Sequence, residues 1–136
     1  MQDLLAAIQT HWDGDPALQA QLGCLWHGRA PAGTATPYAV LVSPVMDTPE
    51  FTSGKPYVEV SRVQFSVFAD GDAQALSLVD TIGKRFDLAK PAIPGAKNYC
   101  IEMRRIAGGV LPDGNDETPA WHAFVEYRVS VGKSLG

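Results

Sequence analysis

The sequence predicts an α+β fold, a mostly antiparallel β-sheet with two N-terminal helices and one long central helix packed on one face. Residues 120–131 alternate apolar and polar side chains, as in a strand with one buried face. Residues 72–88 instead repeat apolar side chains at helical spacing. The expected order is two helices, three strands, a helix and two strands, which is typical of helices gathered on one face of an antiparallel sheet.

Two short helices are expected at the start of the chain. Residues 3–12 repeat apolar side chains at helical spacing, and Asp3 can cap this helix. The second helix begins at Asp15-Pro16, because a capping residue followed by proline at the first helical position is a favoured start. We expect Gly23 to end it.

Short apolar runs then predict two strands separated by loops. Residues 25–27 form a short strand, and residues 38–43 form a buried strand between two prolines. Residues 29–37 and 44–56 are loops by composition. Phe51 lies in the second loop, where an aromatic side chain is a candidate for binding another molecule.

Residues 57–69 give the longest strand signal, but the apolar side chains switch from even to odd positions along it. Val58 and Val60 point to one face, whereas Val63, Phe65 and Val67 point to the other. Either a bulge lies near Ser61–Arg62, or the two halves pack against different partners. We favour a strand whose first half projects beyond the sheet as an arm-like hairpin, with residues 42–46 as its other half.

The second half of the chain completes the sheet. The central helix should bury a stripe formed by Ala75, Leu76, Val79, Ile82 and Phe86. Residues 99–106 form a strand in which Ile101 and Met103 lie opposite Cys100 and Ile106, and residues 108–119 form a glycine-rich acidic loop. The last strand turns one set of side chains to the core, namely Trp121, Ala123, Val125, Tyr127, Val129 and Val131. Trp12 and Trp26 are expected in the core as well.

Length and charge limit the class of protein. The 136 residues suffice for one domain, residues 1–136. A formal charge of −4 argues against a dedicated nucleic-acid binder, and no apolar run is long enough to span a membrane. The start of the chain lacks the basic residues of a secretory signal, so we expect synthesis and use in a cytoplasm or in an assembly made there.

The chain is sparing with charge and rich in turn residues. Charged residues make up 19%, against a usual ~25%, and there are 13 glycines and 10 prolines. A surface with few charges suggests that part of it is covered by another molecule. A compositional bias of the genome explains the figure equally well.

No catalytic, cofactor-binding or metal-ligating set emerges from the motifs. There is no phosphate-binding loop and no nucleophile elbow. Cys24 and His27 have the spacing of half a zinc site, but no second pair follows, so both Cys24 and Cys100 are interpreted as small buried side chains. If the chain were an enzyme or a small-molecule binder, Cys24, His27 and His122 would be its best candidates.

Basic residues form no patch in the sequence. Arg62, Arg104, Arg105 and Arg128 lie on predicted strands, where charges usually sit on solvated faces or edges. The functional alternative is that they form ion pairs with the acidic residues 113–117 of a neighbouring subunit.

Several local features, in order, resemble the phage tail completion family, also described as tail terminator or head–tail joining proteins. They are an N-terminal helix followed by Asp15-Pro16-Ala17-Leu18, the loop 29–33, Pro37-Tyr38 leading into 39–42, Thr48-Pro49-Glu50-Phe51-Thr52, the strand 62–70 leading into a helix with Ala73, Ala75 and Leu76, and the closing strand 125–129. Residues 89–119 depart most from the expected pattern, through their prolines, glycines and acids.

The resemblance implies an α+β fold, a non-enzymatic role and no cofactor. Such proteins form rings, commonly hexameric, at the head-proximal end of the tail tube, where they stop tube polymerisation and join the tail to the capsid neck. The implied partners are the chain itself, the tail tube protein and a head-completion or neck protein, with DNA passing through the lumen without specific binding. The implied location is the tail or neck of the virion, or of a prophage product, after synthesis in the bacterial cytoplasm.

On this interpretation, contacts between subunits or with the tube fall in loop 44–56 and the first half of strand 57–69. The candidate residues are Thr48, Glu50, Phe51, Thr52, Tyr57, Glu59 and Arg62. Two alternatives stay open. One is another neck or tail component, such as a head-closure or tail tube protein, and the other is an enzymatic or small-molecule-binding α+β domain.

Overall fold

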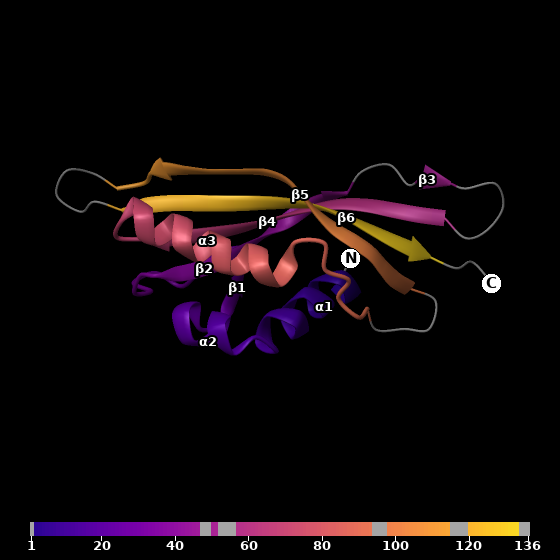
Figure 1. The fold of residues 1–136 in the computed structure, drawn as a ribbon, viewed down its shortest axis with the longest axis horizontal. Helices are drawn as coiled ribbons and strands as arrows, with labels where there is room; N and C mark the ends of the chain where they lie inside the picture. Colours follow the sequence, from indigo (N-terminus) through magenta and orange to yellow (C-terminus); the bar gives the residue numbers. More distant parts are fainter. Residues whose placement is uncertain (1, 47–49, 52–56, 94–97, 115–119, 134–136) are drawn as a thin grey trace.

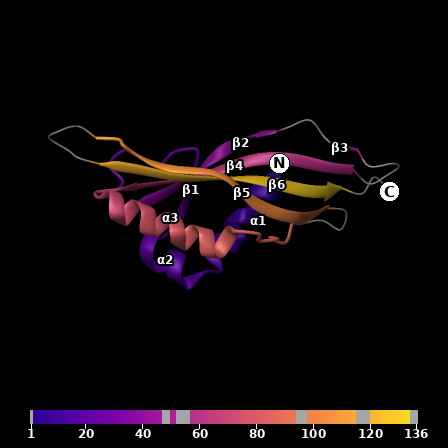
Figure 2. The same cartoon turned by 45° about the horizontal axis from the view of Figure 1, so that its top comes forward.

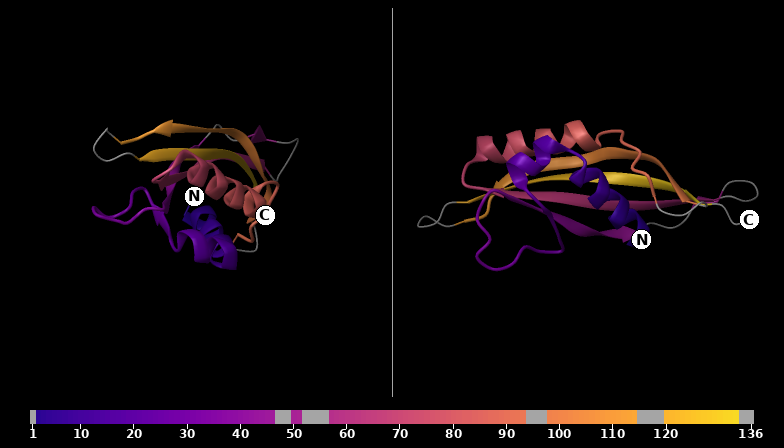
Figure 3. Two further views of the ribbon diagram at one scale, coloured as in Figure 1. Left: turned by 60° about the vertical axis from the view of Figure 1, so that its left-hand side comes forward. Right: turned by 90° about the horizontal axis from the view of Figure 1, so that it is seen from below.

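The computed structural model describes residues 2–46, 50–51, 57–93, 98–114 and 120–133. Its sheet has six strands in the order β1-β2-β4-β6-β5, with β3 beside β4. The strands are β1 (Leu25–His27), β2 (Tyr38–Met46), β3 (Glu50–Phe51), β4 (Tyr57–Ala69), β5 (Asn98–Pro112) and β6 (Trp121–Lys133). The helices α1 (Gln2–Asp13), α2 (Pro16–Leu22) and α3 (Asp72–Phe86) cover one face of the sheet (Figures 1 and 3). The predicted α+β class is confirmed.

The N-terminal helices form where the sequence predicts them, but α1 begins at Gln2, so Asp3 lies inside its first turn and does not cap it. Asp15 is the N-cap of α2, and its Oδ1 accepts a hydrogen bond of 2.9 Å from the backbone nitrogen of Ala17. Gly23 follows α2 with a φ of 67°, a conformation that glycine adopts without strain. The indole nitrogen of Trp12 donates to the carbonyl of Gly23 over 2.9 Å, which ties α1 to the end of α2.

Aromatic side chains from both layers meet at the centre of the core. The ring centroids of Phe65 on β4 and Phe86 on α3 lie 4.7 Å apart. Trp12 stacks on Phe65 at 6.1 Å, and Tyr127 meets Phe65 edge-on at 5.9 Å. All four side chains are fully buried. Such packing supplies most of the stability of the helices on the sheet.

Helix α3 buries a slightly different stripe from the one predicted. Ala75, Val79, Ile82 and Phe86 lie in the core as expected. Leu76, however, is 45% exposed, and Leu78 takes its place against the sheet. At 3.6 residues per turn, positions 75, 78, 79, 82 and 86 share one face, whereas position 76 lies to the side.

Strands β4 and β6 pair without a break over all 13 residues of each. Because this register is continuous, Glu59 and Ser61 share the inward face with Val63, and Val60 lies on the opposite face. Of the two alternatives, a bulge in β4 at Ser61–Arg62 is therefore excluded, and the packing of the two halves on different faces is confirmed. The register shift lies in β2, between Val42 and Val45, and the two halves of β4 bury apolar residues on different faces.

The predicted loop 44–56 needs correction, whereas the predicted pairing of residues 42–46 with the long strand is confirmed at Val42, Val45 and Met46. Strand β2 continues through Pro44 to Met46, which pairs with Ser61 of β4. The two residues of β3 pair with Val58 and Tyr57, so β4 is flanked by β3 and β6 over its first residues. These residues therefore belong to the sheet, although this end of the sheet extends past the helices (Figure 2).

Strand β5 is longer than predicted and takes in the glycines that were assigned to a loop. It runs through Gly108 and Gly109 to Pro112, paired with β6 throughout and with register shifts at two places. The shift between Cys100 and Glu102 changes the parity, so Cys100 and Met103 both enter the core instead of lying on opposite faces. Burial raises the pKa of the Cys100 thiol to about 11.

A polar cluster holds the C-terminal end of α3 on the β5–β6 hairpin. The Asp87 carboxylate receives two bonds from Arg105 of β5, Nε to Oδ1 at 3.1 Å and a terminal nitrogen to Oδ2 at 3.0 Å. The Tyr127 hydroxyl donates to Asp87 Oδ1 over 2.5 Å. Gly83 leaves room for the guanidinium, since a Cβ there would lie 1.9 Å from an Arg105 nitrogen. Burial, followed by the bond to Asp87, raises the pKa of Tyr127.

Replacing Tyr127 by Phe tests this cluster. The free energy of unfolding should fall by about 1–2 kcal/mol, because the ring still fills the core while a hydrogen bond to a charged group is lost. Chemical denaturation measures the change. Tyr38→Phe on the opposite face of the sheet is the matched control, with a change within about 0.5 kcal/mol. Equal losses of unfolding free energy in the two variants would show that the hydrogen bond from Tyr127 to Asp87 does not stabilise the fold.

Candidate functional site

The predicted contact residues gather at the end of the sheet that carries β3. Glu50 and Phe51 form β3, and Phe51 pairs with Tyr57 at the start of β4. Thr48 and Thr52 lie outside the described residues. Five of the seven predicted residues therefore lie on the adjacent strands β3 and β4, and Glu50, Phe51 and Tyr57 lie together where these strands pair.

Glu59 and Arg62 occupy opposite faces of β4. Glu59 is buried, with 9% of its surface exposed, on the face that carries the helices. Arg62 is half-buried on the other face and pairs with Arg128 of β6 in the strand register. These two residues do not share a surface, so a single partner cannot contact both side chains directly.

The face of the sheet turned away from the helices, here called the outer face, carries a row of stacked rings. Tyr38 of β2 stacks on Phe68 of β4 at 5.1 Å, and Phe68 stacks on His122 of β6 at 4.6 Å. Phe124 lies 6.0 Å beyond His122. The alternation of residues 120–131 turns His122 and Phe124 away from the core, but it does not predict the row, because the members of the row come from three strands distant in sequence.

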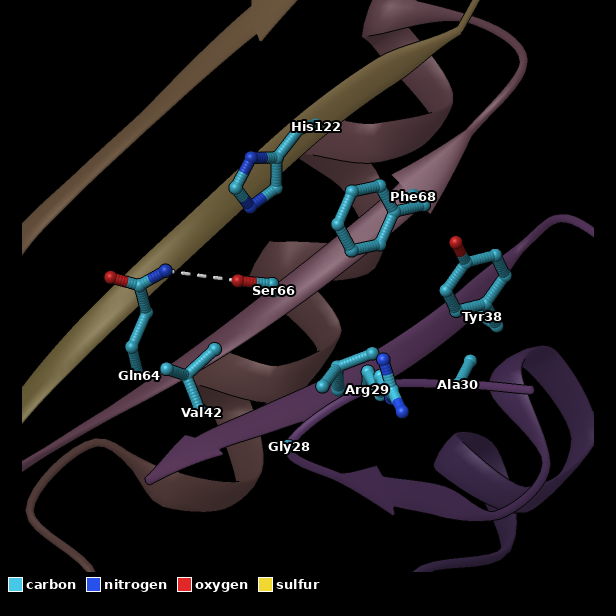
Figure 4. A pocket seen from close by; sticks show the side chains of 10 residues that line it. Gly28, Arg29, Ala30, Tyr38, Val42, Gln64, Ser66, Phe68 and His122 are labelled. Carbon is cyan, nitrogen blue, oxygen red and sulfur yellow. Dashed lines mark hydrogen bonds between the residues drawn. The ribbon is translucent and has the colours of Figure 1, made fainter. Parts of the chain in front are cut away.

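A pocket of about 280 Å³ opens beside this row (Figure 4). Its floor is formed by side chains from β2, β4 and β6, and one wall by the loop after β1 with Gly28, Arg29 and Ala30. Gln64 donates a hydrogen bond of 2.9 Å to the Ser66 hydroxyl across the floor. The remaining lining residues are Tyr38, Val40, Val42, Phe68 and His122. The pocket is mostly apolar, with one cationic side chain at its rim.

His122 is the one titratable group of the aromatic row with a clearly altered pKa. Desolvation lowers its pKa, and the charge of Asp113 opposes that effect in part. The Nε2 atom is buried and has no hydrogen-bond partner. His122 is therefore neutral at pH 7, and its protonation disfavours the folded state.

The residues suggested for an enzyme do not converge. Of Cys24, His27 and His122, only His122 lines the pocket. His27 Nε2 lies 2.7 Å from Gln9 Oε1 of α1, and Cys24 is exposed, which corrects its predicted burial. Within the described residues, no group of three His, Cys, Asp or Glu side chains could hold a metal ion. None of the described helices is long and apolar enough to cross a membrane.

Arg104 and Arg105 pair with carboxylates of the same chain. Arg104 forms an ion pair of 3.0 Å with Glu102, and Arg105 forms one with Asp87. Of the acidic segment 113–117, residues 115–117 lie outside the described residues. The predicted ion pairs between subunits stay a prediction.

Lowering the pH should destabilise the wild-type chain more than a His122→Phe variant. When folding lowers the pKa of a histidine, the folded protein loses stability as the pH falls below about 6.5. The reason is that the unfolded chain binds the proton more readily than the folded chain does. Phenylalanine keeps the stacking on Phe68 and removes the proton. Unfolding curves from pH 7 to 5 measure the difference, and His11 and His27 are common to both chains. An imidazole that titrates by NMR at or above 6.5 would contradict the assignment.

Comparisons with known proteins agree with this architecture. A family model described as tail completion protein gp17 matches residues 6–132. No curated protein matches the chain. Among solved structures, a chain from the virion of a native gene transfer agent particle is similar, with a TM-score of 0.76 and 16% sequence identity. The match covers 95% of this chain and 94% of that chain, and at this identity it shows the fold alone.

The family match extends over the helices, the full sheet and both faces described above. It includes the β3 end and the outer face, and leaves out only the first residues of α1 and the end of β6. The chain belongs to the family of the tail completion protein gp17 and is a structural protein of the phage tail.

Proposed function

We propose that this protein caps the head-proximal end of the tail tube as an oligomeric ring, ends tube polymerisation and joins the tail to the neck of the capsid. The observation that carries the proposal is the match of the tail completion family along residues 6–132. The shared fold with a chain of a gene transfer agent virion supports a place in a particle of this kind.

The proposed partners are other copies of the chain in a hexameric ring, the tail tube protein on one side and a head-completion or neck protein on the other. DNA passes through the lumen without specific binding. A formal charge of −4 suits such a passage, because phosphates are repelled rather than held. The protein would be made in the bacterial cytoplasm and used in the tail or neck.

We place contacts with the tube or a neighbouring subunit at the β3 end of the sheet. Support comes from geometry, since this end extends beyond the helices and Glu50, Phe51 and Tyr57 lie on its adjacent strands (Figure 2). Thr48, Thr52 and Arg62 complete the proposed surface. Glu59 is buried in the isolated chain and would support this surface from beneath.

Purified protein should form closed rings, alone or on addition of the tail tube protein. Light scattering gives the mass in solution, and electron microscopy gives the shape. A tail tube protein would instead stack into open-ended tubes, because a ring that also binds its own copies axially does not stop growing. Open tubes of this chain alone would replace the proposal by that alternative. A persistent monomer with no affinity for tube or neck protein would refute both.

Replacing residues 47–55 by nine Gly and Ser residues tests the proposed surface without shortening the connection between β2 and β4. The variant should fold with nearly unchanged stability but fail to cap tails, which would grow beyond their normal length in electron micrographs. The same replacement of residues 30–35, in the loop between β1 and β2, is the control and should leave capping intact. Normal capping by the 47–55 variant would show that the contact surface lies elsewhere.

A further inference from the structure

Strand β5 forms one border of the sheet, and only part of that border is covered (Figure 1). The backbone nitrogen of Met103 donates a hydrogen bond of 2.9 Å to the carbonyl of Ala89. The carbonyl of Met103 accepts one of 2.8 Å from the backbone nitrogen of Leu88. Among the described residues, these two bonds are the backbone hydrogen bonds on that side of β5. Beyond Met103, the strand continues to Pro112 with β6 as its single neighbour.

The uncovered stretch Ala107–Leu111 has none of the features that usually protect an edge strand. Natural edges carry charges, prolines or bulges that prevent another strand from pairing. Here these features lie outside the stretch, with Arg104, Arg105 and a register shift before it and Pro112 after it. The five residues between them are uncharged and contain no proline.

Two glycines in this stretch let another backbone approach closely. Gly109 lies against the Phe124 ring, whose Cε1 would be 3.1 Å from a Cβ at that position. The ring thus covers the bare backbone on the outer face and keeps the strand extended. Ile106 precedes the stretch and Leu111 is its last residue, and each side chain is 45% exposed. A partner strand would therefore also bury apolar surface.

On the opposite border of the same sheet, part of β2 has β4 as its single neighbouring strand among the described residues. Strand β1 pairs with β2 only from Ala39 to Leu41, and Gly28 donates to the Leu41 carbonyl at its end. From Val42 to Met46, β2 continues along β4 beyond the reach of β1. Val42 is 38% exposed. Pro44 and the register shift between Val42 and Val45 both lie in this stretch, and such features limit pairing at an edge, so fewer backbone groups can pair here than in Ala107–Leu111.

We propose that Ala107–Leu111 of β5 pairs with Val42–Met46 of β2 in a second copy of this chain, so that the sheets of neighbouring subunits join edge to edge. The inference rests on the proposed ring and names the surfaces that build it. Two different stretches at opposite borders of one sheet make a head-to-tail contact, and such contacts close into rings when the rotation between subunits permits. Backbone hydrogen bonds supply the affinity, as in other strand additions.

A double variant, Ala107→Lys with Leu111→Lys, tests the β5 side. Both side chains are exposed in the isolated chain, so the monomer should keep its melting temperature, but pairing would bury two unpaired ammonium groups. The protein concentration at half-assembly should rise at least about tenfold. The matched control is Ala73→Lys with Leu76→Lys on α3, where Leu76 is also 45% exposed. Assembly of the β5 variant at the concentration of the control would overturn the inference.

Hydrogen exchange of the wild-type chain tests both stretches at once. Outward-facing amides within 42–46 and within 107–111 should exchange at least tenfold more slowly in the assembled protein than in the dilute monomer. Rings in which either stretch exchanges as in the monomer would overturn this inference and leave the proposed function intact. A chain that neither oligomerises nor binds the tube protein would overturn the proposed function and the inference together.

Discussion

The unbroken ladder between β4 and β6 is the constraint on which the rest of the structure depends. Thirteen residues of each strand pair in one register, and a slip by one residue would turn every core side chain outward. This register turns Phe65 and Tyr127 toward Trp12 and Phe86, and so seats the helices. The flanking strands β2, β3 and β5 adapt to it, and the register shifts fall in β2 and β5.

Covering only one face of this sheet has functional consequences. The helices bury the inner face, while the outer face keeps a row of aromatic rings and a pocket. Among the described residues, parts of both border strands have a neighbouring strand on one side only. In a soluble monomer such features favour unwanted association. In a structural protein of the phage tail, they are the surfaces at which we propose contacts with other subunits.

The scarcity of charge, 19% of residues, also becomes easier to interpret. Arg105 and Asp87 pair with each other to hold α3 on the hairpin, and Arg104 pairs with Glu102 beside it. The adjacent stretch Ala107–Leu111 has no charge. Gly108 and Gly109 lie within a strand and not in a loop, so part of the excess of glycine lies outside turns.

The sequence by itself determined the order of elements except β3, the cap of α2 at Asp15, the buried stripe of α3 except Leu76, and the inward face of β6, because local propensity and periodicity encode these features. It also determined the family, through residues spread along the chain. Tertiary structure alone decided the parity of Glu59 and Ser61, the extension of β5 through its glycines, and the row from Tyr38 to Phe124. Those features depend on pairing between strands far apart in the sequence, and such pairing leaves no periodic signal within either strand.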